Sequence, residues 1–255
     1  MVATCTHSGR QSQVTKIIAP AKLTLSLVIT GVRSDGFHLI EAEMVSLDIA
    51  DVIEINDADT TTLTVSGPYA NGVPTDASNL VSRALVLVGR TAQVHIEKNI
   101  PHGGGLGGGS TDAAAVLKWA QWSDVPATAQ LGADIPFCLV GGRALVTGIG
   151  EIVTPMPFEA RNVTLFLPPI SVSTPAVYRE WDAMGGPKGP KGNDLEPAAV
   201  SAFPELGLWR DRVESATGAT LHLAGSGSTW FTDGHVHQGL NQIPDVQVVY
   251  ATTRP

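Results

Sequence analysis

The sequence is poor in cysteine, in aromatic residues and in positive charge, and each shortage excludes a class of protein. Its 255 residues include two cysteines, Cys5 and Cys138, too few for a disulfide framework or a thiolate metal site. Such cysteine use fits a reducing compartment. Aromatic residues make up 5% of the chain, so valine, leucine, isoleucine and alanine must build the core. The formal net charge of −8 argues against non-specific binding to nucleic acid or to an anionic membrane.

Long apolar runs are also missing. No run is long enough to span a bilayer. The first 14 residues are polar and lack the apolar segment of a secretory signal. We expect them to form a loose arm, with a short transit peptide as the alternative. These features favour a cytoplasmic protein, and we expect a monomer or a weak homodimer.

The pattern of apolar residues predicts a mixture of strands and helices. Leu23 to Ile29 alternates apolar and polar residues, which predicts a half-buried strand with its four apolar side chains on one face. A turn is expected at 34–36. Further strands are expected within 51–57, 61–67, 92–98, 162–169, 220–234 and 246–253, and helices within 77–89, from about 110, and within 174–184 and 196–218. The irregular order favours an α+β fold, and Pro155 and Pro157 suggest two domains, residues 1–157 and 158–255.

One stretch, PHGGGLGGGSTDAAAVL from Pro101 to Leu117, has glycine at six of the seven positions 103–109. Ordering glycine costs more backbone entropy than ordering any other residue, so such a run requires a reason. Without Cβ atoms, backbone N–H groups can approach a ligand closely. A helix that begins at about Ser110 adds unpaired N–H donors and the positive end of its dipole. We interpret the run as a phosphate-binding loop, in which Ser110 and Thr111 cap the helix or offer hydroxyls to phosphate or to a metal.

Other interpretations of the glycines fit less well. Gly103, Gly105 and Gly108 have the spacing of a dinucleotide-binding turn, but NIPH separates them from the preceding strand and no second strand ending in an acid follows. A P-loop needs lysine after its last glycine, whereas Ser110 follows Gly109 directly. A flexible linker would not end in an alanine-rich helix. A phosphate loop without its own lysine needs a cation from elsewhere, either a metal ion or a distant side chain.

The glycine loop resembles the ATP loop of the GHMP kinases, which phosphorylate small-molecule alcohols. Further segments resemble, within this superfamily, the family of 4-(cytidine 5′-diphospho)-2-C-methyl-D-erythritol kinases: APAKLTLSLVITGVRSDGFH, LGADIPFCLVGGRALVTGIGE, and NDLEPAA with GSGSTWF. The resemblance implies a two-domain α+β GHMP-kinase-like fold with the active site between the domains. It also implies ATP-dependent phosphorylation of the 2-hydroxyl of a small substrate carrying cytidine diphosphate, a step of non-mevalonate isoprenoid precursor synthesis.

The resemblance implies two catalytic residues. Asp134, in LGADIPF, matches the family's catalytic aspartate, and a carboxylate there can take the proton of the acceptor hydroxyl. From the residues alone, a helix-cap or turn aspartate is the simpler interpretation. Lys22, in PAKLTL, matches the catalytic lysine and would keep Asp134 ionised and stabilise the transferring phosphoryl group. The residues expected to bind ATP are Pro101, His102, Gly103, Gly104, Gly105, Leu106, Gly107, Gly108, Gly109, Ser110 and Thr111.

Three residues are expected to bind the substrate. Phe37 and His38, in DGFH, match positions where the family holds the cytidine base, by stacking and by hydrogen bonds. Phe37 stands where the family has tyrosine, so the stacking surface stays and the hydroxyl is lost. Thr24 stands where the family has asparagine. No metal site of the protein's own is expected, because Mg²⁺ would arrive with ATP, and His235 and His237 are interpreted as surface residues.

One segment is shorter than in the family. Between Ala120 and Leu131 the family has about one more helix, and its absence could move Asp134 relative to the glycine loop. Two alternatives therefore accompany the main hypothesis. One is another alcohol kinase of the superfamily, acting on homoserine or a mevalonate. The other is a weakly active or non-catalytic nucleotide-binding relative.

Overall fold

The structure, a computed structural model, describes residues 14–101, 103–189, 191–243 and 246–255. The N-terminal arm expected up to residue 13, with Cys5, lies outside the described residues. The strands are β1 (Thr15–Val32), β2 (His38–Asp57), β3 (Thr62–Ser66), β4 (Ala92–Glu97), β5 (Arg143–Gly148), β6 (Ile152–Pro155), β7 (Asn162–Leu167), β8 (His222–Leu223), β9 (Trp230–Asp233) and β10 (Gln247–Arg254). The α-helices are α1 (Leu80–Leu87), α2 (Gly108–Trp119), α3 (Ile135–Val140), α4 (Thr174–Ala183), α5 (Glu196–Ala202) and α6 (Pro204–Thr217), with 3₁₀ turns η1 (Pro126–Gln130) and η2 (Leu240–Gln242).

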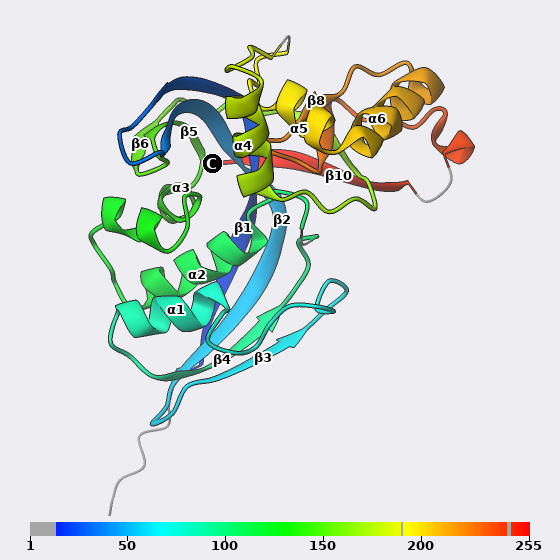
Figure 1. The fold of residues 1–255 in the computed structure, drawn as a ribbon. Helices are drawn as coiled ribbons and strands as arrows, with labels where there is room; N and C mark the ends of the chain where they lie inside the picture. The colour runs from blue at the N-terminus through cyan, green and yellow to red at the C-terminus, as the bar shows by residue number, and fades with distance from the viewer. Residues whose placement is uncertain (1–13, 102, 190, 244–245) are drawn as a thin grey trace, which may run out of the picture.

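The long antiparallel hairpin of β1 and β2 organises the N-terminal half (Figure 1). Strand β2 pairs with β5 along its first part and with β4 along its last part, while β3 pairs in parallel with β4. Helices α1, α2 and α3 lie together on one side of this sheet (Figure 1). The glycine loop leads from β4 into α2, so this arrangement places the loop beside the hairpin.

The C-terminal strand connects the two halves of the chain. In β10, Thr253 lies opposite Leu47 of β2, while Val248 lies opposite Phe166 of β7. Strands β7, β9 and β8 continue the sheet, and helices α4, α5 and α6 lie in the same half of the molecule (Figure 1). The expected α+β class is confirmed. The division into domains 1–157 and 158–255 stays a prediction.

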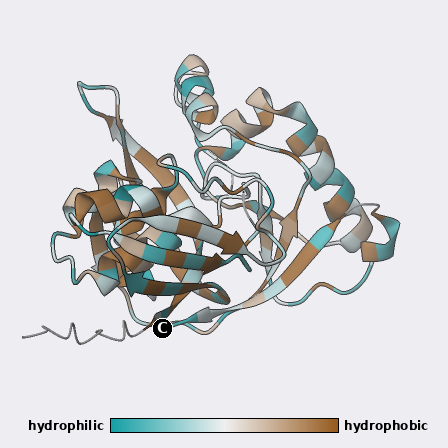
Figure 2. Ribbon diagram, turned by 90° about the horizontal axis from the view of Figure 1, so that it is seen from below, coloured by the Kyte–Doolittle hydropathy of each residue, from teal (hydrophilic) through white to brown (hydrophobic). Residues whose placement is uncertain are grey.

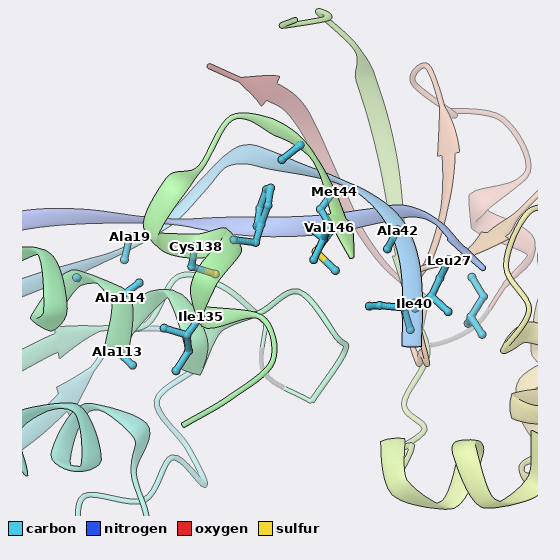
Figure 3. Close-up of a cluster of buried hydrophobic side chains, with 14 of the residues drawn as sticks. Ala19, Leu27, Ile40, Ala42, Met44, Ala113, Ala114, Ile135, Cys138 and Val146 are labelled. Carbon is cyan, nitrogen blue, oxygen red and sulfur yellow. The ribbon is translucent and has the colours of Figure 1, made fainter. Parts of the chain in front are cut away.

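Aliphatic side chains build the core, as the shortage of aromatic residues requires. Hydrophobic residues follow the strands of both halves (Figure 2). One buried cluster lies between the hairpin and the helices and includes Ala19, Met44, Ala114 and Cys138 (Figure 3). Alanines in α2 let that helix approach the sheet closely. At about 25 cal/mol for each Å² of apolar surface removed from water, this burial is the main favourable term in folding.

The expectation that four apolar residues of β1 share one face is wrong. Leu23 belongs to a cluster with residues of β2, β7 and β10, and Leu25 packs against it, whereas Leu27 and Ile29 belong to the cluster beneath the helices. A shift in the β1–β2 register between Thr24 and Ser26 separates these two pairs. A bulge of this kind re-aims side chains along a strand. Leu27 therefore faces the same cavity as Thr24.

Candidate active site

The glycine loop ends in a helix that begins two residues earlier than expected. Gly107 is the N-cap of α2, with a left-handed φ of 72°, and the helix starts at Gly108. No side chain caps it, so the expected capping by Ser110 or Thr111 is wrong. A residue at position 110 lies within the first turn, where backbone N–H groups have no partner in the helix. These donors therefore stay free for an anion.

Close packing explains three of the loop's glycines. A Cβ atom on Gly104 would lie 2.5 Å from Thr229 Oγ1, and one on Gly105 would lie 2.9 Å from a carbonyl oxygen of a second glycine turn, residues 225–231. On Gly107 it would lie 2.6 Å from Lys22 Cγ. The backbone N–H of Thr229 also donates to the carbonyl oxygen of Gly104 at 3.2 Å. The second glycine turn therefore lies against the loop.

Lys22 and Asp134 meet beside the glycine loop. Lys22 Nζ lies 3.1 Å from Asp134 Oδ2 and donates to Thr24 Oγ1 at 3.2 Å. The Lys22 side chain is 7% exposed and the Asp134 side chain is 31% exposed, so the lysine is sequestered while its partner reaches solvent. The backbone N–H of Lys22 also donates to the carbonyl oxygen of Leu106 at 3.0 Å. A lysine distant in sequence therefore lies against the loop, as expected for the cation.

Asp134 does not serve as a helix cap. It occupies the N-cap position of α3, but its side chain accepts no hydrogen bond from the helix. The carboxylate contacts Lys22 instead. The short connection before it, folded as η1, leaves this contact intact. Asp134 therefore lies beside Lys22, which itself contacts the glycine loop, and the effect of the shorter segment on activity stays a prediction.

The Lys22–Asp134 pair lines a cavity of about 220 Å³. The N-terminal half also contributes Gly105 and Ser110, and the C-terminal half contributes Tyr178 and others. The remaining lining residues are Thr24, Leu27, His38, Ile40, Met44, Ala133, Ile149, Thr174, Leu195, Ala224, Gly225 and Ser226. Residues far apart in the sequence, from both halves of the chain, thus surround one cavity.

His38 lies at this cavity within an aromatic group. Its Nε2 lies 2.8 Å from Asp182 Oδ1, and its ring centroid lies 4.7 Å from that of Tyr178 and 5.5 Å from that of Trp181. Burial, and secondarily the charge of Asp134, raise the pKa of Tyr178 to about 12. Its hydroxyl therefore stays protonated at neutral pH. A flat aromatic surface beside an imidazole suits a heteroaromatic ring.

Other predicted site residues lie elsewhere or face other groups. Phe37 is 56% exposed and is not among the residues that line the cavity, and the Arg33 guanidinium lies 5.8 Å from its ring centroid. Thr111 is buried beside Cys138. Burial, and secondarily the charge of Asp134, raise the pKa of the Cys138 thiol to about 12. His102 lies outside the described residues.

A second cavity, of about 450 Å³, borders the other part of the glycine loop. It touches Pro101, Gly103 and Gly104, whereas the first cavity touches Gly105 and Ser110. Tyr69 and Gln247 also line it. The loop thus lies between two spaces of different size.

The NDLEPAA segment, residues 193–199, is hydrogen-bonded to the second glycine turn and to β1. Asn193 Nδ2 donates to the carbonyl oxygens of Leu223 at 2.8 Å and Gly225 at 2.7 Å. Asp194 Oδ2 accepts from the backbone N–H of Ile29 at 2.9 Å and from Lys188 Nζ at 2.8 Å. The bond from Ile29 to Asp194 joins the C-terminal half to β1, and the other three lie within the C-terminal half.

Sequence reasoning missed the contribution of α4. Thr174, Tyr178 and Asp182 are spaced by four, and Trp181 lies on the same face. This spacing, with aromatic residues and an acid on one face of a predicted helix, could have signalled a binding surface. Within the described ranges, no group of three or more histidine, cysteine or acidic residues is arranged to hold a metal ion, and no helix is long and apolar enough to cross a membrane.

Comparisons with known proteins agree with this geometry. Residues 79–142 match the family description "GHMP kinases N terminal domain". The 4-diphosphocytidyl-2-C-methyl-D-erythritol kinase of Paracoccus denitrificans (strain Pd 1222) is 38% identical over 232 residues, which cover 84% of each chain. A crystal structure of 4-(cytidine 5′-diphospho)-2C-methyl-D-erythritol kinase shares 30% identity with a TM-score of 0.72, covering 94% of this chain and 99% of that one.

A structure with lower sequence identity shares the fold of this chain without showing membership of the same family. The homoserine kinase of Cytophaga hutchinsonii has a TM-score of 0.60 at 16% identity, covering 98% of this chain and 97% of that one, and shows likeness of fold alone. Together, the fold and the glycine loop define a kinase of the GHMP class. Within this class, the chain belongs to the 4-diphosphocytidyl-2-C-methyl-D-erythritol kinase family.

Proposed function

We propose that this enzyme transfers the γ-phosphoryl group of ATP to the 2-hydroxyl of 4-(cytidine 5′-diphospho)-2-C-methyl-D-erythritol. One observation carries the proposal beyond family membership. The Lys22–Asp134 pair, 3.1 Å apart, lies in a cavity that the glycine loop also lines. Phosphoryl transfer needs a base for the acceptor, positive charge at the phosphoryl group and a cradle for the phosphates. The cavity offers all three.

Each group has one step in the reaction. Asp134 accepts the proton of the substrate hydroxyl as its oxygen attacks phosphorus, and ADP leaves. Lys22 holds the Asp134 carboxylate in place and stabilises negative charge on the transferring group. The free N–H groups of the loop and of the first turn of α2 hold the phosphates.

The two cavities separate the two substrates. A triphosphate lying along the loop from Gly103 to Ser110 would place its nucleoside in the larger cavity and its γ-phosphate at Lys22. The acceptor alcohol then enters the smaller cavity. The loop itself spans the distance between them, which supports transfer between the two sites.

The aromatic group of α4 supports recognition of the cytidine base. Tyr178 offers a stacking surface, and the second ring nitrogen of His38 is left for the base because Asp182 occupies Nε2. Phe37 is a second stacking candidate at the neighbouring turn. Thr24, held by Lys22, offers its hydroxyl to the methylerythritol unit.

Mg²⁺ fits this site as a companion of ATP. Among the lining residues of the cavity, Asp134 is the carboxylate and Ser110 is a hydroxyl at the glycine loop, so the protein offers few hard oxygen ligands rather than a cage. Mg²⁺ keeps phosphate and water ligands readily and needs few from the protein. When bound, it would neutralise charge on the phosphates. We also propose a cytoplasmic enzyme, which the scarcity of cysteine supports, and a monomer or weak homodimer.

The test is ADP release by the purified protein with Mg²⁺ and ATP. We expect release to depend on the cytidine substrate, and no release above background would overturn the proposal. Homoserine and mevalonate serve as competing acceptors. Turnover of either without need for a cytidine compound would favour another alcohol kinase. ATP binding without turnover of any acceptor would favour a non-catalytic relative.

A further inference from the structure

Three charged side chains are buried together behind the glycine loop, outside both cavities. Lys98 follows β4, Asp51 lies on β2 and Asp112 lies on α2, and their exposed fractions are 2%, 0% and 3%. Lys98 Nζ donates to Asp51 Oδ2 and, at 2.7 Å, to Asp112 Oδ2. We call these residues the buried cluster. Burying charge is costly unless it is paired, so the fold retains the cluster at a cost.

The buried cluster holds both ends of the glycine loop. Asp51 Oδ1 accepts the backbone N–H groups of Asn99, at 2.5 Å, and Ile100, at 2.8 Å, which lead into the loop. At the other end, a Cβ atom on Gly108 would lie 3.1 Å from Lys98 Nζ and 3.6 Å from Asp51 Oδ2. The ammonium therefore lies directly beneath the first residue of α2. Asp112, in the second turn, ties the helix itself to Lys98.

The charges of the buried cluster do not balance when every group is ionised. One ammonium faces two carboxylates, and Asp112 Oδ1 is buried without a hydrogen-bond partner among the described residues. Burial is the largest influence on the pKa of the Asp112 carboxyl. Burial and the negative charge of Asp51 together outweigh the opposite effect of Lys98 and raise this pKa to about 8. A neutral Asp112 carries its proton on the otherwise unpartnered oxygen, and the cluster is then neutral.

Among the described residues that pack around α2, Lys98 and Asp51 are the charged groups that act on Asp112. Helix α1 presents Val81, Ala84 and Leu85, and α3 presents Ile135 and Cys138. From β1, Lys22 faces Asp134. The groups that act on the Asp112 carboxyl are Lys98 and Asp51.

We propose that Lys98, Asp51 and Asp112 are positioning residues that hold the glycine loop in the conformation that binds the phosphates of ATP, and that Asp112 is protonated when they do so. This inference rests on the proposed function, because it assigns the phosphates of ATP to the loop. Ionisation of Asp112 places an uncompensated negative charge beneath the N-terminus of α2. That charge repels the Asp51 carboxylate, which holds the residues leading into the loop, and it repels the phosphates that the loop binds.

The experiment measures binding of a non-hydrolysable ATP analogue by calorimetry at pH 7 and pH 9, without acceptor. With a pKa of about 8, roughly a tenth of Asp112 stays protonated at pH 9, so Kd for the wild type rises up to about tenfold. Asp112→Asn mimics the neutral acid, and we expect its Kd to stay level over this range. Asp57→Asn is the control, because Asp57 is an exposed carboxylate on the same strand as Asp51. It should follow the wild type.

A second variant tests Lys98. Lys98→Met leaves the buried Asp51 carboxylate without its cation and removes the donor to Asp112, so we expect Kd and KM for ATP to rise at least about tenfold, with KM for the acceptor within threefold of wild type. If this variant does not fold, the comparison of wild type with Asp112→Asn decides alone. If Kd for the ATP analogue depends on pH equally in the wild type and in Asp112→Asn, the inference is overturned, whether or not the enzyme phosphorylates an acceptor. Failure of the wild type to phosphorylate the cytidine substrate overturns the proposed function instead. The Kd measurements with the ATP analogue still test the role of the buried cluster in that case.

Discussion

Gly107→Ala tests how tightly the reaction depends on the position of Lys22. The new Cβ atom would lie 2.6 Å from Lys22 Cγ, whereas carbon atoms in contact lie about 3.5 Å apart, so the lysine must move by about 1 Å. A displacement of about 1 Å at a catalytic group costs roughly a hundredfold in rate. We therefore expect kcat to fall about a hundredfold.

Gly89→Ala isolates the backbone contribution to that effect. Gly89 has a φ of 65°, close to the 72° of Gly107, but nothing lies within 4 Å of its Cβ position. Both variants pay about 1–2 kcal/mol for alanine in the left-handed conformation, which lowers Tm by roughly 2–8 °C. Only Gly107→Ala should lose kcat, measured by ADP release at saturating substrates. If Gly107→Ala keeps kcat within threefold of Gly89→Ala, Lys22 does not need its observed position.

The remaining predictions concern the base site and acid stability. Tyr178→Ala should raise KM for the cytidine substrate more than Phe37→Ala does, because Tyr178 lines the cavity and Phe37 does not. KM for ATP should stay level in both variants. A larger increase in Phe37→Ala would indicate that the cytosine base binds at the turn of Phe37 instead. Burial alone would raise the pKa of Asp194, but hydrogen bonds from Lys188, Ile29 and Gly189 outweigh it and lower that pKa. A lowered pKa stabilises the fold above the ordinary value of 3.8, and the gain is lost as pH falls through the folded value. Urea unfolding should therefore show the wild type losing more stability than Asp194→Asn between pH 5 and pH 3, and parallel curves would contradict this.

Local patterns predicted most of the elements and the principal contact of the site. The helix that ends before Gly89 and the strands of the C-terminal half occur where apolar periodicity and glycine placed them. The absence of a lysine in the glycine loop predicted a cation from elsewhere; Lys22 lies against the loop, and its action on the phosphates stays a prediction. The family resemblance led to Asp134, which spacing alone could not distinguish from a helix cap.

Features that depend on three-dimensional packing were not predictable in this way. The bulge near Leu25 reverses the face of β1, and a two-residue period carries no sign of it. The glycines were attributed to a ligand, yet contacts with Lys22, Thr229 and Gly227 also require them. Lys98, Asp51 and Asp112 are charged, and charged residues are almost never fully buried unless paired. Their meeting requires β2 to pack against both ends of the glycine loop, 47 or more residues further along the chain.

The central claim is that Asp134 acts on the acceptor hydroxyl while the glycine loop binds ATP independently of it. The most direct measurement is kcat for Asp134→Asn at saturating Mg²⁺, ATP and cytidine substrate, beside Kd for the ATP analogue. Asparagine can still accept a hydrogen bond from Lys22 but cannot take a proton, so we expect kcat to fall by at least about a hundredfold with Kd within threefold of wild type. A variant that keeps its kcat would contradict the account.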